Sequence, residues 1–350
     1  MAAKKTVYVG LSGGVDSSVS AALLKEQGYN VVGVYMKNWS KDLPGYPCPW
    51  KDDYQDAKRV AVQLGIEFKM FDFEKEYFTS VVQYMLDGFE AGITPNPDIM
   101  CNQEVKFKLY LKAALQQGAD YVATGHYANS RDGHLFAATD TNKDQTYFLY
   151  RMTNDALTKT LFPLAGYTKP QVRELAKKFK LVTATKKESM GICFVGKVGI
   201  KEFLQQFLPP QKPGAIVDQN GVTVGQHDGA IYYTIGQRHG LNVGGGLPYY
   251  VTSKDMAKNE VYVTSDIQDE KLWSSTITIT SPHWLRQPVP TKELVVRTRH
   301  RGPLTEVTGI EKVKNNCYTL HLSEPLRALT PGQSAVLYHK NECIGGGIIC

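Results

Sequence analysis

Short apolar runs alternate with amphipathic stretches along the first 130 residues. Runs rich in valine, tyrosine and phenylalanine have the length of strands at 5–11, 29–36, 66–73 and 119–128. Apolar residues between them recur at helical spacing, which predicts helices near 15–27, 53–64, 76–89 and 105–117. This alternation predicts an α/β fold, with a doubly wound parallel sheet covered by helices on both faces. Ligands of such sheets bind at the carboxyl ends of the strands.

The pattern changes near residue 205. A stretch rich in proline and glycine at 208–229 precedes β-type runs at 230–236 and 259–264. From residue 273 on, short β-type runs follow one another at 275–280, 292–300, 316–322 and 333–339. Their spacing is typical of a small barrel or sandwich. We therefore predict three domains: the α/β domain at 1–205, a small mostly-β domain at 206–272 and a β-barrel at 273–350.

The first strand leads into a loop with the sequence GLSGGVDS at 10–17. Adjacent glycines permit torsions closed to other residues and let a ligand approach the main chain. The following helix presents a positive N-terminus, which favours phosphate. The loop matches neither GxxxxGK[ST] nor the dinucleotide fingerprint GxGxxG. The order Ser-Gly-Gly-x-Asp-Ser resembles the pyrophosphate loop of ATP pyrophosphatases, which split ATP into AMP and pyrophosphate.

Charge and cysteine content narrow the classes of function. The 350 residues include 40 basic and 34 acidic side chains, and the net charge of +6 permits a nucleic-acid partner without requiring one. No apolar stretch has membrane-spanning length, and the first residues lack a signal-peptide core. Six dispersed cysteines exclude a disulfide scaffold and a zinc ribbon. We expect a reducing, cytoplasmic setting in which any reactive cysteine pair is catalytic.

Two cysteines lie where a thiolate is favoured. Cys101 follows Asp98 just before the helix expected at 105–117, and a helix N-terminus lowers the pKa of a thiol. Cys193 follows two lysines in the stretch KKESMGICFVG, and their charge acts in the same direction. Taken singly, each cysteine is more typical of a small buried apolar side chain.

Together with NKDQTYFL at 142–149 and YYTIGQRHGL at 232–241, these motifs resemble the tRNA-specific 2-thiouridylase family. The resemblance covers the whole chain, down to ALTPGQSAVLYHKNECIGGG at 328–347. One departure is the stretch ESM at 188–190, where the family has an aspartate, a serine and a small polar residue. The resemblance implies a tRNA sulfurtransferase that makes 2-thiouridine at the wobble position of lysine, glutamate and glutamine tRNAs.

The resemblance also implies a mechanism. ATP adenylates O2 of the uridine, because that oxygen is otherwise a poor leaving group, and Asp16 helps to place Mg²⁺. Cys193 carries sulfur as a persulfide, which a cysteine desulfurase or a sulfur-relay protein delivers. Cys101 then frees the sulfur and a Cys101–Cys193 disulfide remains. Asp98 moves a proton or orients the flipped base.

Binding residues follow from the same resemblance. The nucleotide site is expected to comprise Gly10, Leu11, Ser12, Gly13, Gly14, Val15, Asp16, Ser17, Met36 and Gly125. The target base and the tRNA are expected to contact Asn96, Pro97, Asp98, His126, Lys143, Asp144, Gln145, Arg299, His300 and Gln333. Ordinary alternatives exist for some of them: a methionine such as Met36 is typical of a core, and the stretch RTRHRG at 297–302 is also typical of a solvated strand.

Other functions fit parts of this pattern. An iron–sulfur cluster held by Asp98, Cys101 and Cys193 would support the same thiolation. A lysidine-forming ligase or a small-molecule amidotransferase would use the same loop without a cysteine pair. An RNA-binding protein gated by ATP would need no chemistry at all.

Overall fold

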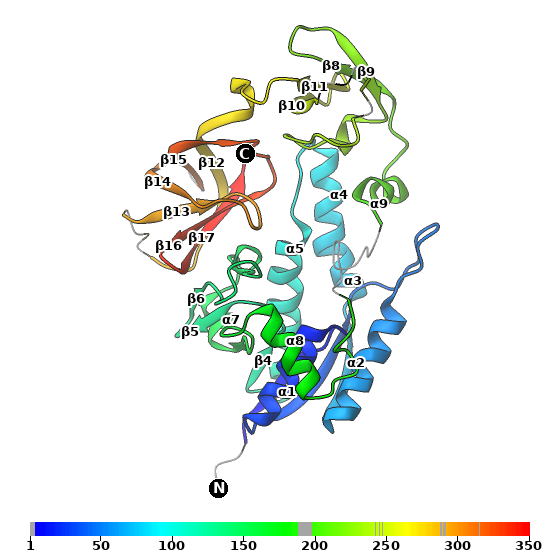
Figure 1. The fold of residues 1–350 in the computed structure, drawn as a ribbon, viewed down its shortest axis with the longest axis vertical. Coiled ribbons are helices and arrows are strands. Elements are labelled where there is room, and N and C mark those ends of the chain that lie inside the picture. Colours follow the sequence, from blue (N-terminus) through cyan, green and yellow to red (C-terminus); the bar gives the residue numbers. More distant parts are fainter. Residues whose placement is uncertain are drawn as a thin grey trace.

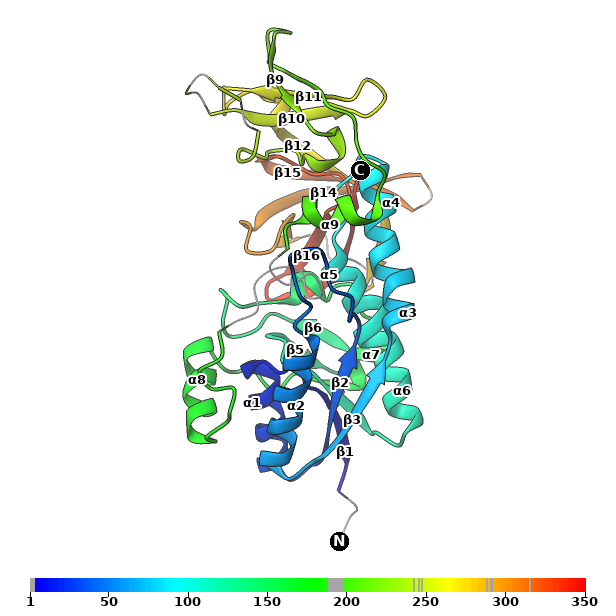
Figure 2. The same cartoon turned by 90° about the vertical axis from the view of Figure 1, so that its right-hand side faces the viewer.

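The N-terminal part is a parallel sheet of five strands between helices (Figure 1, Figure 2). The computed structural model describes residues 4–187, 198–241, 243–244, 246, 248–287, 289, 292–314 and 316–350. The strand order is β3-β2-β1-β4-β7, with β1 Thr6–Gly10, β2 Asn30–Lys37, β3 Glu67–Asp72, β4 Tyr121–Ala123 and β7 Thr160–Leu161. All four pairings are parallel, so the carboxyl ends of the strands meet at one edge. The predicted α/β class is confirmed.

Helices cover both faces of this sheet because successive strand residues point to opposite sides. Helices α1 (Val15–Glu26) and α2 (Trp50–Leu64) share one core cluster with Val7, Val9 and Leu11. Tyr8 points the other way, into a cluster that includes Tyr110 and Ala114. Helix α8 (Lys169–Lys178) packs against α1.

Two helical runs cross the middle of the molecule. The first comprises α3 (Glu74–Tyr77), the π-helical η1 (Phe78–Val82) and α4 (Gln83–Glu90). The second comprises α5 (Pro97–Met100), the π-helical η2 (Cys101–Tyr110) and α6 (Leu111–Gln116). This run begins before the helix predicted at 105–117, because Asn96 caps it and Pro97 takes its first position. Cys101 therefore lies inside the helix, and the expected place just before a helix is wrong.

The central part is a mixed four-stranded sheet. Its order is β10-β11-β8-β9, with β8 Gly214–Val217, β9 Thr223–His227, β10 Tyr250–Asp255 and β11 Glu260–Thr264, and it follows helix α9 (Ile200–Phe207). The run at 230–236, predicted as a strand, instead contains the 3₁₀ turn η4 (Ala230–Tyr232). Its three residues are all buried, which a half-exposed strand would not allow. Their core cluster includes Tyr77 and Met85 of the first helical run.

The C-terminal part is a closed β-barrel of six strands, which confirms the predicted barrel. After the turn η5 (Glu270–Leu272), its strands are β12 Trp273–Trp284, β13 Leu294–Arg297, β14 Thr305–Lys314, β15 Cys317–Arg327, β16 Ser334–His339 and β17 Glu342–Ile349. The order β12-β15-β14-β13-β16-β17 closes because β12 also pairs with β17. Closure removes exposed edges that would otherwise invite association.

A hairpin from the N-terminal part extends this barrel sheet. Strands β5 (Asn129–Arg131) and β6 (His134–Phe136) follow β4 in the chain, yet β6 pairs with β17 through Phe136 to Glu342. The Glu342 carboxylate accepts hydrogen bonds from His134 Nδ1 at 2.6 Å and from Arg286 at 2.8 Å. The hairpin thus joins the two parts by backbone and side-chain contacts. The segments that follow it include η3 (Thr146–Phe148) and α7 (Asn154–Thr158).

Within the described residues, none of the helices combines the length and the apolar character needed to cross a membrane.

Candidate active site

The glycine-rich loop after β1 has a conformation that only glycine allows at one position. Gly13 has a φ of +74°, and a side chain there would overlap the backbone of Asp53. The Ser17 hydroxyl accepts a hydrogen bond from the Ser12 amide at 3.2 Å and holds the loop closed. Helix α1 has Gly14 as its N-cap, which offers no side chain to the first helical amides. Those amides are therefore suited to bind an anion.

Residues from two neighbouring strands complete the surroundings of the loop. A Cβ atom on Gly10 would lie 2.9 Å from Met36 Cε, so β1 and β2 meet here closely. A Cβ atom on Gly125 would lie 2.7 Å from the Ser17 amide nitrogen. The ten residues expected at the nucleotide site are thus brought together at the carboxyl ends of β1, β2 and β4.

Asp16 is engaged by two side chains. Lys169 Nζ lies 2.7 Å from each oxygen of the carboxylate, and the Tyr127 hydroxyl donates to one of them at 3.0 Å. Lys169 occupies the first turn of α8 and is 11% exposed. Our sequence interpretation did not include Lys169, because a lysine at the start of a helix carries no signal of its partner 153 residues away.

The carboxylate of Asp16 fits a magnesium ion that the protein and a bound nucleotide would hold together. Mg²⁺ in nucleotide sites commonly takes one or two carboxylates and completes its shell with phosphate oxygens and water. Asp16 supplies such a carboxylate beside the loop. Among the residues that the structure describes, no cluster of three or more histidine, cysteine or acidic side chains could hold a metal alone. Phosphates of the nucleotide would have to complete this site.

The expected base-binding residues come together from distant parts of the chain. The Asn96 side chain caps α5 and also lies 3.3 Å from the Gln333 side chain. Gln333 in turn donates to the carbonyl of Thr94 at 2.8 Å. Asp98 follows on α5, and Cys101 begins η2 with 2% of its surface exposed. Cys193 lies outside the described residues.

His126 lies between the glycine-rich loop and the helical run at 97–116, which contains Cys101 and is called the cysteine helix below. Its Nδ1 lies 2.8 Å from the Thr124 hydroxyl, and its Nε2 lies 3.5 Å from Lys106 Nζ on η2. Burial, and then the charge of Lys106, lowers the pKa of His126 well below its usual value, so the ring is neutral at pH 7. Lys106 is a second residue that the sequence interpretation did not include.

Two stretches predicted to contact tRNA meet at the junction with the barrel. Arg301 donates to the carbonyl of Asn142 at 2.8 Å, and the rings of His300 and Phe148 lie 4.7 Å apart. Lys143 is half-buried in the same loop and Arg299 is exposed. The positive charges of Lys143, Arg299 and Arg301 therefore gather on one surface.

Two polar residues of this loop serve the fold. Asp144 is 4% exposed; burial raises its pKa, while hydrogen bonds and Arg297, at 3.4 Å, oppose that rise. Gln145 exchanges two hydrogen bonds of 2.9 Å with the backbone of Tyr127, one of them through its side chain. Both side chains thus position the loop 142–145 against its neighbours.

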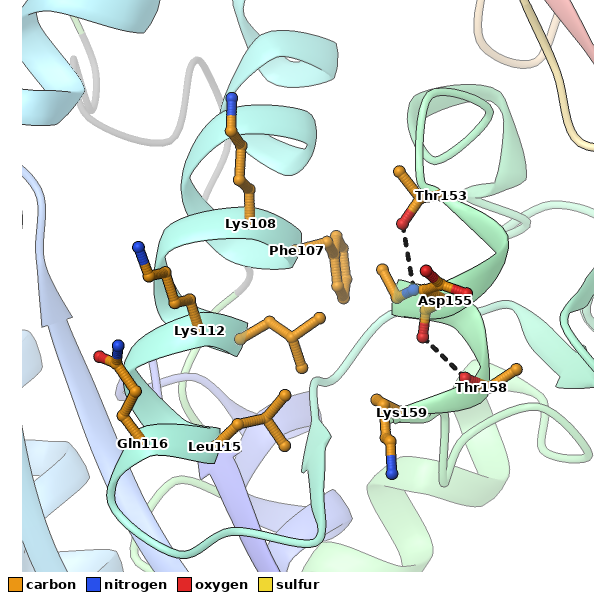
Figure 3. A pocket seen from close by; sticks show the side chains of 11 residues that line it. Phe107, Lys108, Lys112, Leu115, Gln116, Thr153, Asp155, Thr158 and Lys159 are labelled. Carbon is orange, nitrogen blue, oxygen red and sulfur yellow. Dashed lines mark hydrogen bonds between the residues drawn. The ribbon is translucent and has the colours of Figure 1, made fainter.

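A cavity of about 550 Å³ lies elsewhere, between the helix η2–α6 and α7 (Figure 3). Phe107 and Leu115 line it, with Lys108, Lys112 and Lys159 around them. None of the catalytic or binding residues predicted from the sequence lines this cavity.

Comparison with known proteins identifies the family. Three family models match in succession: a tRNA methyl transferase HUP domain at 5–197, a tRNA methyl transferase PRC-barrel domain at 201–265 and an aminomethyltransferase beta-barrel domain at 274–349. The tRNA-specific 2-thiouridylase MnmA of Bacillus subtilis (strain 168) is 47% identical over 98% of this chain and 94% of its own length. The enzyme of the same name from Streptococcus thermophilus (strain CNRZ 1066) is 47% identical over 99% and 95%.

A solved 4-thiouridine synthetase–RNA complex with bound ATP covers 58% of this chain and 50% of its own at 19% identity, but its TM-score of 0.39 is too low to bear on function. The sequence relatives match nearly end to end and share one name. This chain belongs to the tRNA-specific 2-thiouridylase family, and it is accordingly a tRNA sulfurtransferase that uses ATP.

Proposed function

We propose that this protein converts the wobble uridine of lysine, glutamate and glutamine tRNAs to 2-thiouridine, through an adenylated base and a persulfide on Cys193. One contact supports this above others. His126 follows Gly125, which packs against the nucleotide loop, and its Nε2 lies 3.5 Å from Lys106 Nζ in the helical run that contains Cys101. A base placed between the loop and this helix would face both the nucleotide and the thiol.

The first step activates the base. The uridine O2 attacks the α-phosphorus of ATP, and the bond from that phosphorus to the pyrophosphate oxygen breaks. The amides at the start of α1 hold the departing pyrophosphate, because the positive helix N-terminus stabilises its charge. Mg²⁺, when bound with the nucleotide at Asp16, would neutralise part of the triphosphate charge.

The second step delivers sulfur. The terminal sulfur of the Cys193 persulfide attacks C2, and AMP leaves as the C2–O bond breaks. The Cys101 thiolate then attacks Cys193 Sγ, so the S–S bond of the persulfide breaks and its electron pair forms the C2=S group. The resulting Cys101–Cys193 disulfide is reduced by a thiol reductant of the cytosol. A cysteine desulfurase or a sulfur-relay protein restores the persulfide.

Other residues position the tRNA. Asp98 lies one turn before Cys101 and is suited to move a proton of the base. Asn96 and Gln333, which are joined by a side-chain hydrogen bond, orient the base. Lys143 and Arg299 contact phosphates, because both belong to the positive surface at the barrel junction. Asp144 acts indirectly, through Arg297.

Nucleoside mass spectrometry on tRNA treated with protein, ATP, Mg²⁺ and a persulfide donor tests this proposal. The wild type should form 2-thiouridine and release pyrophosphate. Cys101→Ser should release pyrophosphate and carry persulfide on Cys193 but form no 2-thiouridine, since the resolving thiol is missing. Cys350→Ser, at an exposed cysteine in the barrel, is the matched control and should behave as wild type.

Each alternative has its own outcome in this assay. Bound iron and acid-labile sulfide after anaerobic purification, with persulfide on neither cysteine, would favour the cluster mechanism. Unchanged activity in Cys101→Ser would favour a different pyrophosphate-loop adenylase. No pyrophosphate release in the presence of tRNA would leave only an RNA-binding role.

A further inference from the structure

Lys169 reaches the nucleotide loop from a fixed position. Thr168 and Gln171 form a capping box at the start of α8, and the Lys169 amide donates to Asp140 at 2.8 Å. These bonds anchor the backbone, and the side chain extends to Asp16 with 11% of its surface exposed. A lysine held in this way has lost most of its rotamer freedom before any ligand arrives.

The Lys169–Asp16 pair balances charge inside the site. Both carboxylate oxygens lie 2.7 Å from the ammonium, and the Tyr127 hydroxyl donates to one of them. Asp16 is in the first turn of α1, so its backbone is part of the anion-binding end of that helix. An ATP molecule seated there would place polyphosphate beside this pair.

Polyphosphate and metal would compete for the two partners. A carboxylate is the preferred ligand of Mg²⁺, whereas an ammonium group binds phosphate oxygens well. A metal ion bound at Asp16 would also repel the Lys169 ammonium, which lies 2.7 Å from the carboxylate oxygens in the free protein.

We propose that Lys169 is a nucleotide-binding cation of this enzyme: it pairs with Asp16 in the free protein and transfers to the polyphosphate of ATP when the metal–nucleotide complex binds. The transfer keeps the charges balanced, because Asp16 exchanges one cation for another and Lys169 exchanges one anion for another. Lys169 then stabilises the pyrophosphate that leaves during adenylation.

This inference rests on the proposed use of the loop for ATP, and it makes a separate prediction. Calorimetry in the absence of tRNA should compare ATP binding with EDTA and ATP binding with Mg²⁺. With Mg²⁺, Lys169→Met should bind ATP roughly 10- to 100-fold more weakly, the effect of losing one charge-assisted hydrogen bond. With EDTA it should also bind ATP more weakly, because the charge of Asp16 is then left uncompensated beside the polyphosphate.

Asp16→Asn should respond differently to the metal. Without Mg²⁺ it should bind ATP at least as tightly as wild type, because Lys169 is released and a negative charge is removed. With Mg²⁺ it should bind ATP more weakly than wild type, because the metal has lost its carboxylate.

Two controls separate this role from a structural one. Lys169→Arg keeps the charge and should remain within a few-fold of wild type, whereas Lys177→Met changes an exposed lysine of the same helix and should have no effect. If the pair only stabilises the fold, both Asp16→Asn and Lys169→Met should lower the unfolding temperature and weaken ATP binding in both conditions. That result, or wild-type ATP binding by Lys169→Met, would overturn the proposal. If the wild type formed no 2-thiouridine in the tRNA assay, that result would instead contradict the proposed function.

Discussion

His300 lies in a group of cations at the barrel junction. Burial lowers its pKa first, and the charges of Arg301, Arg297 and Lys143 lower it further, to about 4. A histidine in the unfolded chain has a pKa of about 6.5. Between these two values the unfolded chain binds a proton that the folded chain does not bind. The contribution of His300 to stability is therefore present above pH 6.5 and is lost as the pH falls towards 4.

Replacing His300 with asparagine should flatten this pH dependence. The unfolding midpoint of the wild type should fall more steeply between pH 6.5 and 4 than that of His300→Asn, whereas the curves should run parallel above pH 7. Thermal unfolding at a series of pH values measures both. His126, His227 and His283 also have lowered pKa values, but they are present in both proteins and cancel. Parallel curves over the whole range would contradict the assignment to His300.

Individual side chains of a charged stretch have different roles that sequence alone does not separate. The stretch RTRHRG at 297–302 indicated a positive surface, and Arg299 is exposed as expected. Arg297, two residues earlier, is mostly buried against Asp144. The two partners are 153 residues apart, so no local pattern reveals that this pair is internal. Lys169 and Lys106 escaped the sequence interpretation for the same reason.

At the scale of elements, local signals predicted α1 and four of the five sheet strands, because each of these has its own apolar pattern. The two-residue strand β7 was not predicted, because it is too short to show such a pattern. The start of the cysteine helix was placed too late: the capping residue Asn96 and Pro97 were interpreted only as contacts for the base. Caps mark helix ends through backbone hydrogen bonds, and a residue can serve both purposes. The pairing of β6 with β17 had no local signal, since it joins residues more than 200 positions apart.

Glu342 holds this long-range pairing, and its loss should destabilise the protein. Glu342→Gln keeps the shape but weakens the bonds to His134 and Arg286. Since these two partners are each partly exposed, we expect a loss of about 1 kcal/mol in the free energy of unfolding. Denaturant titration measures it. Glu311→Gln is the matched control: Glu311 lies on β14 in an exposed pair with His321 of β15, and the change should alter stability by less than about 0.5 kcal/mol. Equal effects in both variants would show that the junction is no stronger than a surface ion pair.

At the scale of the whole molecule, the positive surface at the junction should determine how tRNA affinity depends on salt. Each phosphate contact made by a cation adds about 0.9 to the slope of log affinity against log salt for duplex nucleic acid, and about 0.7 for single strands. Arg299→Ala should lower this slope by about one contact and leave ATP affinity unchanged. Arg59→Ala, at an exposed arginine on α2, should leave the slope as it is. An unaltered slope in Arg299→Ala would assign this arginine to ordinary solvated surface.

The order of the parts, a parallel sheet followed by a β-rich part and a barrel, could be predicted from the sequence. The spacing of apolar residues differs between helices and strands, and the succession of these elements indicates the type of each domain. Core packing across the parts could not. Phe203 shares a core with Tyr77, and Tyr147 shares one with Val336. Apolar residues of this kind indicate burial but not the partner, which only the folded chain supplies.

The hairpin at 129–136 has a practical consequence for anyone who divides or recombines this chain. A cut at the expected boundaries near 205 or 272 would separate Phe136 from Glu342 and leave the start of β17 without its neighbour. A barrel expressed alone would carry an unpaired stretch of backbone, which favours association with other chains. A chimera that takes its barrel from a relative would need the matching hairpin as well. The unit to exchange is therefore the barrel together with the hairpin at 129–136.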